Sequence, residues 1–202
     1  MTTGAGASFN TLMKCRVASS LTLALCLVAP SGALAQDGSC PPAPDHSAAL
    51  TELIRAAQAA EDEPAGRQLS NEMWALWSDA PDAHAQELLD EGMSRRNIYD
   101  YDGAMKAFEA LVAYCPDYAE GYNQRAFIHF LREDFSAALP DLDRAISLSP
   151  RHVAAITGRA LTLSALERKA EAVLDLRKAL AMNPWLGERH LLPVLEAAEQ
   201  EL

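Results

Sequence analysis

The sequence predicts an all-α chain built from repeated helix pairs, and three observations support this prediction. Half of the residues are apolar, which is enough to bury a core, but only 6% are aromatic. Alanine, leucine and glutamate are plentiful, which favours helices over a β-sandwich, where aromatic and β-branched residues are enriched. Pro116, Pro150 and Pro184 are spaced by 34 residues, which is typical of a repeat architecture.

The first 35 residues are typical of a cleaved secretory signal peptide. A basic segment at Lys14–Arg16 precedes an uncharged apolar run at 17–29, and residues 33–35 form a small-x-small cleavage signal. This pattern predicts cleavage after Ala35, a mature chain that begins at Gln36, and a periplasmic or secreted protein. The apolar run is too short to cross about 30 Å of hydrocarbon, and no other stretch is long enough, so we expect no membrane span in the mature chain.

Two alternatives concern this amino-terminal region. A signal peptide that starts at Met13 would have ordinary proportions, so Met1–Leu12 could be an over-long start. A lipoprotein is the other alternative, because Leu23–Cys26 resembles a lipobox. However, Leu25 is bulky, and lipoboxes have a small residue directly before the cysteine.

Four further columns of residues keep the 34-residue step of the three prolines. They are Ala104, Ala138 and Ala172; Phe108, Leu142 and Leu176; Val112, Ile146 and Leu180; and Gly92, Ala126 and Ala160. The first three columns are four residues apart within each unit, so they lie on one face of a helix. Each unit ends in a proline, which lacks a backbone donor and disfavours helical geometry in the residue before it.

The repeated segments resemble tetratricopeptide repeats. The segments that carry the resemblance are Tyr101–Pro116, Phe135–Pro150 and Ala170–Pro184. The resemblance implies a right-handed superhelical stack of antiparallel helix pairs. Its three full repeats are expected at 85–118, 119–152 and 153–186.

Regions on both sides of the repeats are expected to complete the stack. Residues 46–84 contain two amphipathic segments, His46–Ala60 and Arg67–Ser78, which predict a degenerate helical hairpin packed on the first full repeat. Residues 187–202 are expected to form a capping helix that restarts at Pro193, because repeat stacks need polar-backed ends for solubility.

Five residues inside the expected helices carry separate predictions. Trp74 and Trp77 lie at helical spacing among apolar neighbours, which favours packing in a core over a platform for a ligand. Pro140 removes a backbone hydrogen bond at a cost of about 3 kcal/mol, so it predicts a kink or a regular helix that starts near it. Asp141 and Asp143 diverge by about 200° on a helix, so we expect both on the surface.

Two cysteines, Cys40 and Cys115, remain after the signal peptide is removed. In an oxidising compartment a disulfide between them would close a loop of about 75 residues and restrict the unfolded chain by about 4 kcal/mol in the entropy model. It would link the expected tether at 36–45 to the first repeat. Two free thiols are the alternative.

Charge and motifs favour a binding protein over an enzyme. The chain has 17 basic and 28 acidic residues, and loss of Lys14 and Arg16 with the signal peptide changes the formal charge from −11 to −13. Such a surface repels phosphate backbones, so a nucleic-acid partner is not expected. The histidines have no zinc-site spacing, and catalytic serine elbows and phosphate-binding glycine loops are absent, so we expect no metal or cofactor.

The resemblance implies that a protein or peptide partner binds a concave groove formed by the first helices of successive repeats. It assigns to this groove Leu89, Met93, Arg96 and Asn97, then Asn123, Gln124, Phe127 and Phe130, and finally Thr157, Gly158 and Leu161. Phe127 and Phe130 are equally compatible with packing between helices. Repeat proteins that bind chaperone carboxyl termini have basic and amide residues where this chain has Leu89, Met93, Ala154 and Gly158, so we do not expect that binding mode.

The sequence therefore predicts an exported scaffold or adaptor of bacterial type, with a role in envelope assembly. One alternative is an accessory subunit whose convex or amino-terminal face clamps an envelope enzyme. Another is an enzyme with an unrecognised site.

Overall fold

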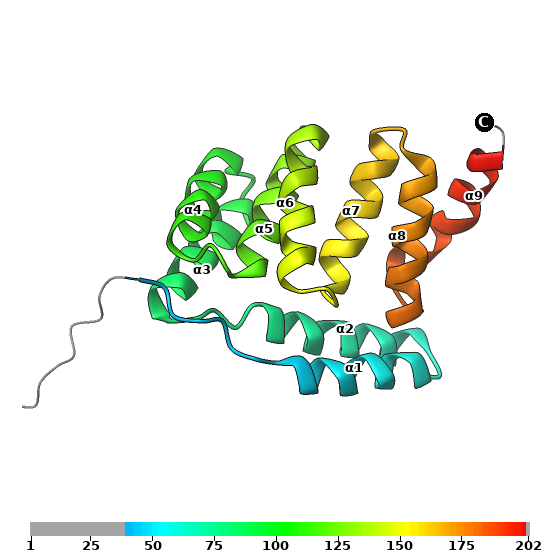
Figure 1. Cartoon of the computed structure of the whole chain (residues 1–202), viewed down its shortest axis with the longest axis horizontal. Helices are drawn as coiled ribbons and strands as arrows, with labels where there is room; N and C mark the ends of the chain where they lie inside the picture. Colours follow the sequence, from blue (N-terminus) through cyan, green and yellow to red (C-terminus); the bar gives the residue numbers. More distant parts are fainter. Residues whose placement is uncertain (1–38, 201–202) are drawn as a thin grey trace, which may run out of the picture. The chain divides into compact units, whose positions relative to one another are not determined.

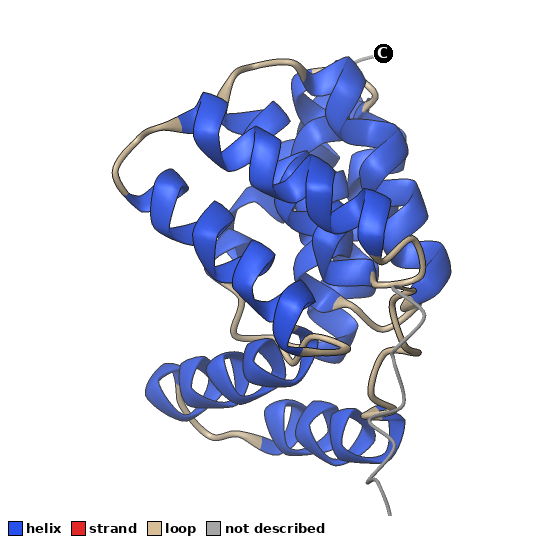
Figure 2. Ribbon diagram, turned by 90° about the vertical axis from the view of Figure 1, so that its left-hand side faces the viewer, coloured by secondary structure: helices blue, strands red, loops and turns tan. Residues whose placement is uncertain are grey.

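The computed structural model of this chain describes residues 39–200, apart from the side chains of 198–200. The predicted signal peptide and its cleavage site between Ala35 and Gln36 lie outside the described residues. Every regular element in the described part is a helix (Figure 2), which confirms the all-α prediction. None of these helices is long and apolar enough to cross a membrane.

Three antiparallel helix pairs form the repeats (Figure 1). They are α3 (Ala83–Asn97) with α4 (Tyr101–Tyr114), α5 (Ala119–Leu131) with α6 (Phe135–Leu148), and α7 (Val153–Ala165) with α8 (Lys169–Met182). The turn inside each pair contains a residue with a φ of about 60°, and these residues, Tyr99, Glu133 and Glu167, keep the 34-residue step. The register therefore sets the backbone of the turns as well as the helices.

Side chains cap the first turns of most repeat helices. Asp82 accepts a hydrogen bond from the Ala85 amide at 2.8 Å at the start of α3, and Asp100 and Asp134 do the same for α4 and α6. Because the first amides of a helix have no partner within the helix, such caps stabilise its start.

The first repeat is built around a core that also takes in Ile128 of α5. Leu89 and Phe108 are fully buried there with Leu111. At the crossing of α3 and α4, Gly92 lies against the Phe108 ring so closely that a Cβ atom would come within 2.3 Å of it. Only glycine fits without displacing the ring.

The amino-terminal hairpin, α1 (Ser47–Ala59) and α2 (Glu63–Trp77), does not pack on the first repeat as expected. It lies across the turns that join successive repeats (Figure 1). Its apolar side chains share a core with the second and third repeats. These side chains are Leu50, Ile54, Ala57, Met73 and Trp77. The amphipathic pattern predicted the helices correctly, but it does not specify which surface covers an apolar face.

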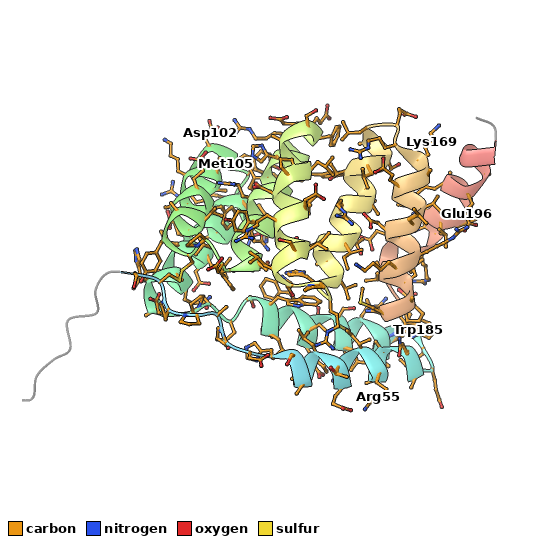
Figure 3. All side chains as sticks on the ribbon, in the orientation of Figure 1. Arg55, Asp102, Met105, Lys169, Trp185 and Glu196 are labelled. Atoms are coloured by element: carbon orange, nitrogen blue, oxygen red, sulfur yellow. A yellow bond between two sulfur atoms is a disulfide. The ribbon has the colours of Figure 1, made fainter. Side chains whose placement is uncertain are left out.

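Polar contacts fix the hairpin in this position. Arg151 donates to the Ser47 carbonyl at 2.8 Å, and Asn183 donates to Ser70 Oγ at 2.7 Å. Trp185 packs beside α2 (Figure 3), where a Cβ on Gly66 would lie 2.2 Å from its ring. The hairpin is thus held at the turn between α6 and α7 and at the connection that follows α8.

One of the two alternatives for Pro140 is wrong, because α6 begins at Phe135 and continues through the proline, so regular helix does not start near it. The kink stays a prediction. The surface position expected for Asp141 is also wrong. Asp141 is only 6% exposed, because both of its oxygens accept hydrogen bonds from Arg125, each at 2.7 Å. Asp143 is exposed and pairs with Arg159 at 2.8 Å.

The third repeat has the same buried pair. Arg159 donates to both oxygens of Asp175, at 2.7 and 2.9 Å, and this pair lies 34 residues after Arg125 and Asp141. Hydrogen bonding to each aspartate raises the pKa of its arginine. Bidentate pairs of this kind lock the first helix of a repeat to the second.

The chain ends of the described part also have defined positions. After Pro184 a short 3₁₀ helix, η1 (Gly187–Leu191), leads into α9 (Leu192–Gln200), so the last helix restarts one residue before Pro193. At the other end the structure brings Cys40 to Cys115 with a Cα–Cα distance of 5.1 Å, and the two sulfur atoms are bonded. This distance is within the usual disulfide range.

Candidate functional site

A cavity of about 330 Å³ lies between α5 and α7, on the face formed by the first helices of the repeats. Most of the predicted groove residues line it. They are Arg96, Asn123, Gln124, Phe127, Phe130, Thr157, Gly158 and Leu161. The shared 34-residue register explains this agreement, because equivalent positions on successive first helices face the same side.

Three predicted residues lie elsewhere. Leu89 is fully buried in the core of the first repeat, so it is not part of an accessible surface. Met93 is half-buried and packs against that same core. Asn97 is exposed at the end of α3, where its side-chain oxygen lies 3.4 Å from the Arg96 guanidinium. The groove therefore belongs to the second and third repeats, with Arg96 as the contribution of the first.

The two phenylalanines are divided between groove and packing. Phe127 is 43% exposed and lies under the guanidinium of Arg96, whose central carbon is 5.4 Å from the ring centroid. Phe130 is half-buried and makes an edge-to-face contact with Phe135, with centroids 5.3 Å apart. Phe127 is thus available to a ligand, whereas Phe130 also joins α5 to α6.

Trp74, Leu186 and Glu188 complete the lining. The prediction of core packing is correct for buried Trp77 but wrong for Trp74, which is 39% exposed and lines the cavity. Leu186 and Glu188 had not been assigned to the groove. Trp74 and Leu186, together with Ala154, also line a second cavity of about 220 Å³ beside α2. These three residues therefore form a wall between the two cavities, at the beginning of α7. Leu186 belongs to a column with Tyr118 and His152, spaced by 34 residues, and both of those residues contact Trp77 of the hairpin. This column was therefore a signal in the sequence for the surface on which the hairpin packs.

A hydroxyl and two amides give the groove a polar floor. Thr157 Oγ1 is buried and has no hydrogen-bond partner among the described residues. Asn123 donates to Glu120 at 3.0 Å, and Gln124 donates to the other oxygen of Glu120. The Gln124 carbonyl accepts from Arg96 at 2.6 Å. The groove thus has polar groups beside its apolar walls.

Behind this floor lies a buried Glu120–His152 pair. His152 Nδ1 accepts from the Ala155 amide, so its proton is on Nε2, which donates to Glu120 at 2.8 Å. The imidazole stacks on Trp77 with ring centroids 4.3 Å apart, and the Trp77 carbonyl accepts from Tyr118 at 2.8 Å. Burial, together with the Glu120 charge, raises the pKa of the Tyr118 phenol. Hydrogen bonds and stacking thus connect the groove to the hairpin.

Arg96 differs from most arginines in the described part of the chain. Ion pairs with carboxylates hold Arg125, Arg132 and Arg159, among others. No carboxylate among the described residues lies within ion-pairing distance of Arg96, whose partners are the Gln124 and Asn97 side-chain oxygens and the Phe127 ring. Burial lowers the pKa of the Arg96 guanidinium, and the Glu120 charge behind Gln124 only partly opposes this.

No group of three or more histidine, cysteine or acidic side chains in the described part could hold a metal ion.

No protein-family model matches the chain. A TPR repeat-containing protein of Rhizobium etli is 25% identical over 115 residues, which cover 57% of this chain and 56% of that protein. The tetratricopeptide repeat protein 36 homolog of Nematostella vectensis is 38% identical over 71 residues, or 35% of this chain and 39% of that protein. The chain thus spans about half, or less, of the length of these relatives.

Solved structures share the fold. The first TPR of Spaghetti (RPAP3), bound to an HSP90 peptide, has a TM-score of 0.56 at 23% identity and covers 57% of this chain and 93% of its own. The TPR2B domain of yeast Sti1, in a complex with pHsp70, has a TM-score of 0.54 at 25% identity. The match covers 60% of this chain and 100% of that domain. MamA of Desulfovibrio magneticus RS-1 has a TM-score of 0.54 at 17% identity. The match covers 79% of this chain and 88% of the MamA chain. With the 34-residue register and the stacked helix pairs, these similarities show that the chain has the tetratricopeptide-repeat fold.

Proposed function

We propose that this chain is a scaffold or adaptor that binds a protein or peptide partner in the groove between α5 and α7. The observation that carries the proposal is the preformed cavity of about 330 Å³, which has the size of a small ligand site. Exposed Phe127 offers apolar contact, and the amides of Asn123 and Gln124 lie among the lining residues. Apolar walls with a few placed polar groups are typical of binding sites.

The peptide complexes of the similar structures support this proposal. The RPAP3 and Sti1 domains were solved with an HSP90 peptide and with pHsp70, respectively. In this chain, Leu89 and Met93 occupy two of the positions that bind the carboxyl terminus in such proteins, and they pack in or against the first-repeat core. The partner is therefore expected to be recognised differently, even though the fold is shared.

We further propose that the protein acts outside the cytoplasm, in the periplasm or after secretion, in support of envelope assembly. This part of the proposal rests on the signal-peptide pattern at 1–35 and is consistent with the Cys40–Cys115 pair. Amino-terminal sequencing of the protein exported by a bacterial host is expected to begin at Gln36. An intact residue 1 on the exported protein would contradict it.

Peptides selected from a random displayed library on the purified chain test the groove directly. Phe127→Ala is expected to weaken the selected peptides about tenfold, as loss of an aromatic contact does at an interface. The matched control is Leu174→Ala, because Leu174 is also exposed but lies on α8, outside the groove lining. Equal affinities for Phe127→Ala and the wild type would show that the peptides bind elsewhere.

A further inference from the structure

The strongest unexplained feature of the groove is the charge of Arg96. Its guanidinium is half-buried, donates to the neutral Gln124 carbonyl and lies over Phe127, with no carboxylate partner among the described residues. The chain has 28 acidic residues, and exposed arginines such as Arg132 readily find one of them. Glu120 lies behind Gln124 and is not in direct contact with Arg96, so an anion that arrives with a ligand and pairs directly with this partly buried cation is favoured.

The position of the wall determines how a ligand can enter. Ala154 stands in the first turn of α7, where it forms the wall with Trp74 and Leu186. Arg96 stands in the last turn of α3. The first helices of successive repeats run in the same direction, so Arg96 and the wall lie at opposite ends of the groove.

This arrangement favours a side chain over a chain terminus as the inserted group. The wall residues Trp74, Ala154 and Leu186 are apolar, so a carboxyl terminus pushed against them would be buried without a cation. Glu188, the acidic residue of the lining, follows closely after Leu186 and would repel it. An apolar side chain fits at the end of the groove formed by the wall. The peptide backbone that carries this side chain then lies near Arg96, at the other end.

On the basis of the proposed function, we propose that the partner is a peptide segment with a large apolar side chain next to an internal aspartate or glutamate. The apolar side chain occupies the space between Phe127 and Trp74, and the neighbouring carboxylate pairs with Arg96. Burial lowers the pKa of the Arg96 guanidinium in the free protein, although the group remains charged. A carboxylate in direct contact offsets the cost of burying this charge, which makes Arg96 a specificity-determining residue.

An array of capped peptides tests this proposal on the whole chain. Each peptide has an acetylated amino end, an amidated carboxyl end and one Phe, Leu, Met or Trp next to Asp, Asn or Lys. We expect Asp peptides to bind about tenfold more tightly than Asn peptides, the ratio that a charge-assisted hydrogen bond gives, and Lys peptides to bind most weakly. A parallel set with a free carboxyl end and Asn in place of Asp shows whether a terminal carboxylate is bound instead.

Variants assign the preference to Arg96. In Arg96→Gln the Asp-to-Asn ratio is expected to fall to about one, and in Arg96→Lys part of it is expected to remain. Arg55→Gln is the matched control, because it removes the same charge from an exposed site on the outer side of α1 (Figure 3). Thermal melts followed by circular dichroism check that each variant is folded.

Several outcomes would overturn the proposal. Equal binding of Asp and Asn peptides by the wild type, or an Asp preference that survives in Arg96→Gln, removes Arg96 as the anion site and leaves peptide binding intact. If the wild type prefers only the peptides with a free carboxyl end, the anion that binds Arg96 is a chain terminus and not an internal acidic side chain. Failure of every peptide, acidic or neutral, to bind the wild type contradicts both this inference and the proposed function.

Discussion

The first repeat and the two repeats that follow share one register, but different interactions hold them together. The first repeat has its own core around Phe108, and the Cys40–Cys115 link joins it to the amino-terminal segment. The second and third repeats share a core with the hairpin α1–α2 and each contain a buried arginine–aspartate pair. The register sets helices and turns, whereas residues outside its columns decide what each repeat packs against.

This difference locates the groove in the part of the chain that the hairpin braces. At the positions of Arg125 and Asp141, the first repeat has Glu91 and Ala107, so it cannot form the pair. The groove lies between the two repeats that do form it, and Trp74 of the hairpin closes one end. The hairpin is therefore part of the site, and substitutions that loosen it should alter binding as well as stability.

The largest expected effect comes from Trp77→Ala. Trp77 is buried against His152 and packs in the core that the hairpin shares with the second and third repeats, so its removal should lower the free energy of unfolding by about 3–5 kcal/mol. Urea denaturation measures the loss. Trp74→Ala is the matched control, because Trp74 is 39% exposed in the same helix and should cost clearly less. Equal losses would mean that the stacked contact does not anchor the hairpin.

Opening the Cys40–Cys115 link tests the other side of the comparison. Cys40→Ser is expected to lower the free energy of unfolding by about 2–4 kcal/mol, because the link closes a loop of 75 residues in the unfolded chain. The same loss should follow reduction of the wild type, and reduction should leave Cys40→Ser unchanged. Thiol alkylation and mass measurement on the non-reduced exported protein should find no free thiol at either position. Two labelled cysteines would mean that the pair is not oxidised there.

Much of the fold and most of the groove could be predicted from periodicity. Columns such as Ala104, Ala138 and Ala172 specify local helix packing, because each repeat meets its neighbours in the same way. Equivalent surface positions are then equivalent in space, which is why Asn123, Phe127 and Thr157 were found. Periodicity specifies positions wherever neighbours along the chain are also neighbours in the structure.

Packing between distant segments could not be predicted in the same way. The apolar faces of α1 and α2 were visible as patterns, but the choice between the first repeat and the inter-repeat turns depends on tertiary complementarity. Because α2 packs on the inter-repeat turns, its Trp74 side chain lines the groove. Burial of Asp141 was missed because the aspartate was considered alone. Its partner lies 16 residues earlier, and the recurrence of this spacing at Arg159 and Asp175 was the available signal.

Arg125→Met should produce a smaller loss, confined to the repeats that contain the pair. It leaves Asp141 buried without its two hydrogen bonds, so we expect the free energy of unfolding to fall by about 2 kcal/mol. Arg132→Met is the control, because its ion pair with Asp102 is exposed and should contribute about 0.5 kcal/mol or less. Chemical denaturation of both variants gives the comparison. A loss no larger than that of the control would make the buried pair irrelevant to stability.

The smallest effect concerns how the first and third repeats begin. Asp82 caps α3, and hydrogen bonds from the Ala85 amide, then from Tyr114, hold its pKa below the ordinary value of 3.8. His152 takes the equivalent role at α7, fully buried. Since a carboxyl with a lowered folded pKa stabilises the fold above its unfolded pKa, the contribution of Asp82 is present above pH 3.8 and is lost as pH falls through the folded pKa.

Asp82→Asn isolates this charge, because asparagine caps helices about as well as aspartate. Above pH 3.8 the wild type should be slightly more stable than the variant, and the difference should disappear as pH falls through the lowered folded pKa of Asp82. Urea denaturation at a series of pH values on both sides of 3.8 measures the difference. A constant difference across that series would show that Asp82 stabilises α3 by hydrogen bonding alone, in which case the first repeat is held by its core and the cysteine link, with no electrostatic contribution from its cap.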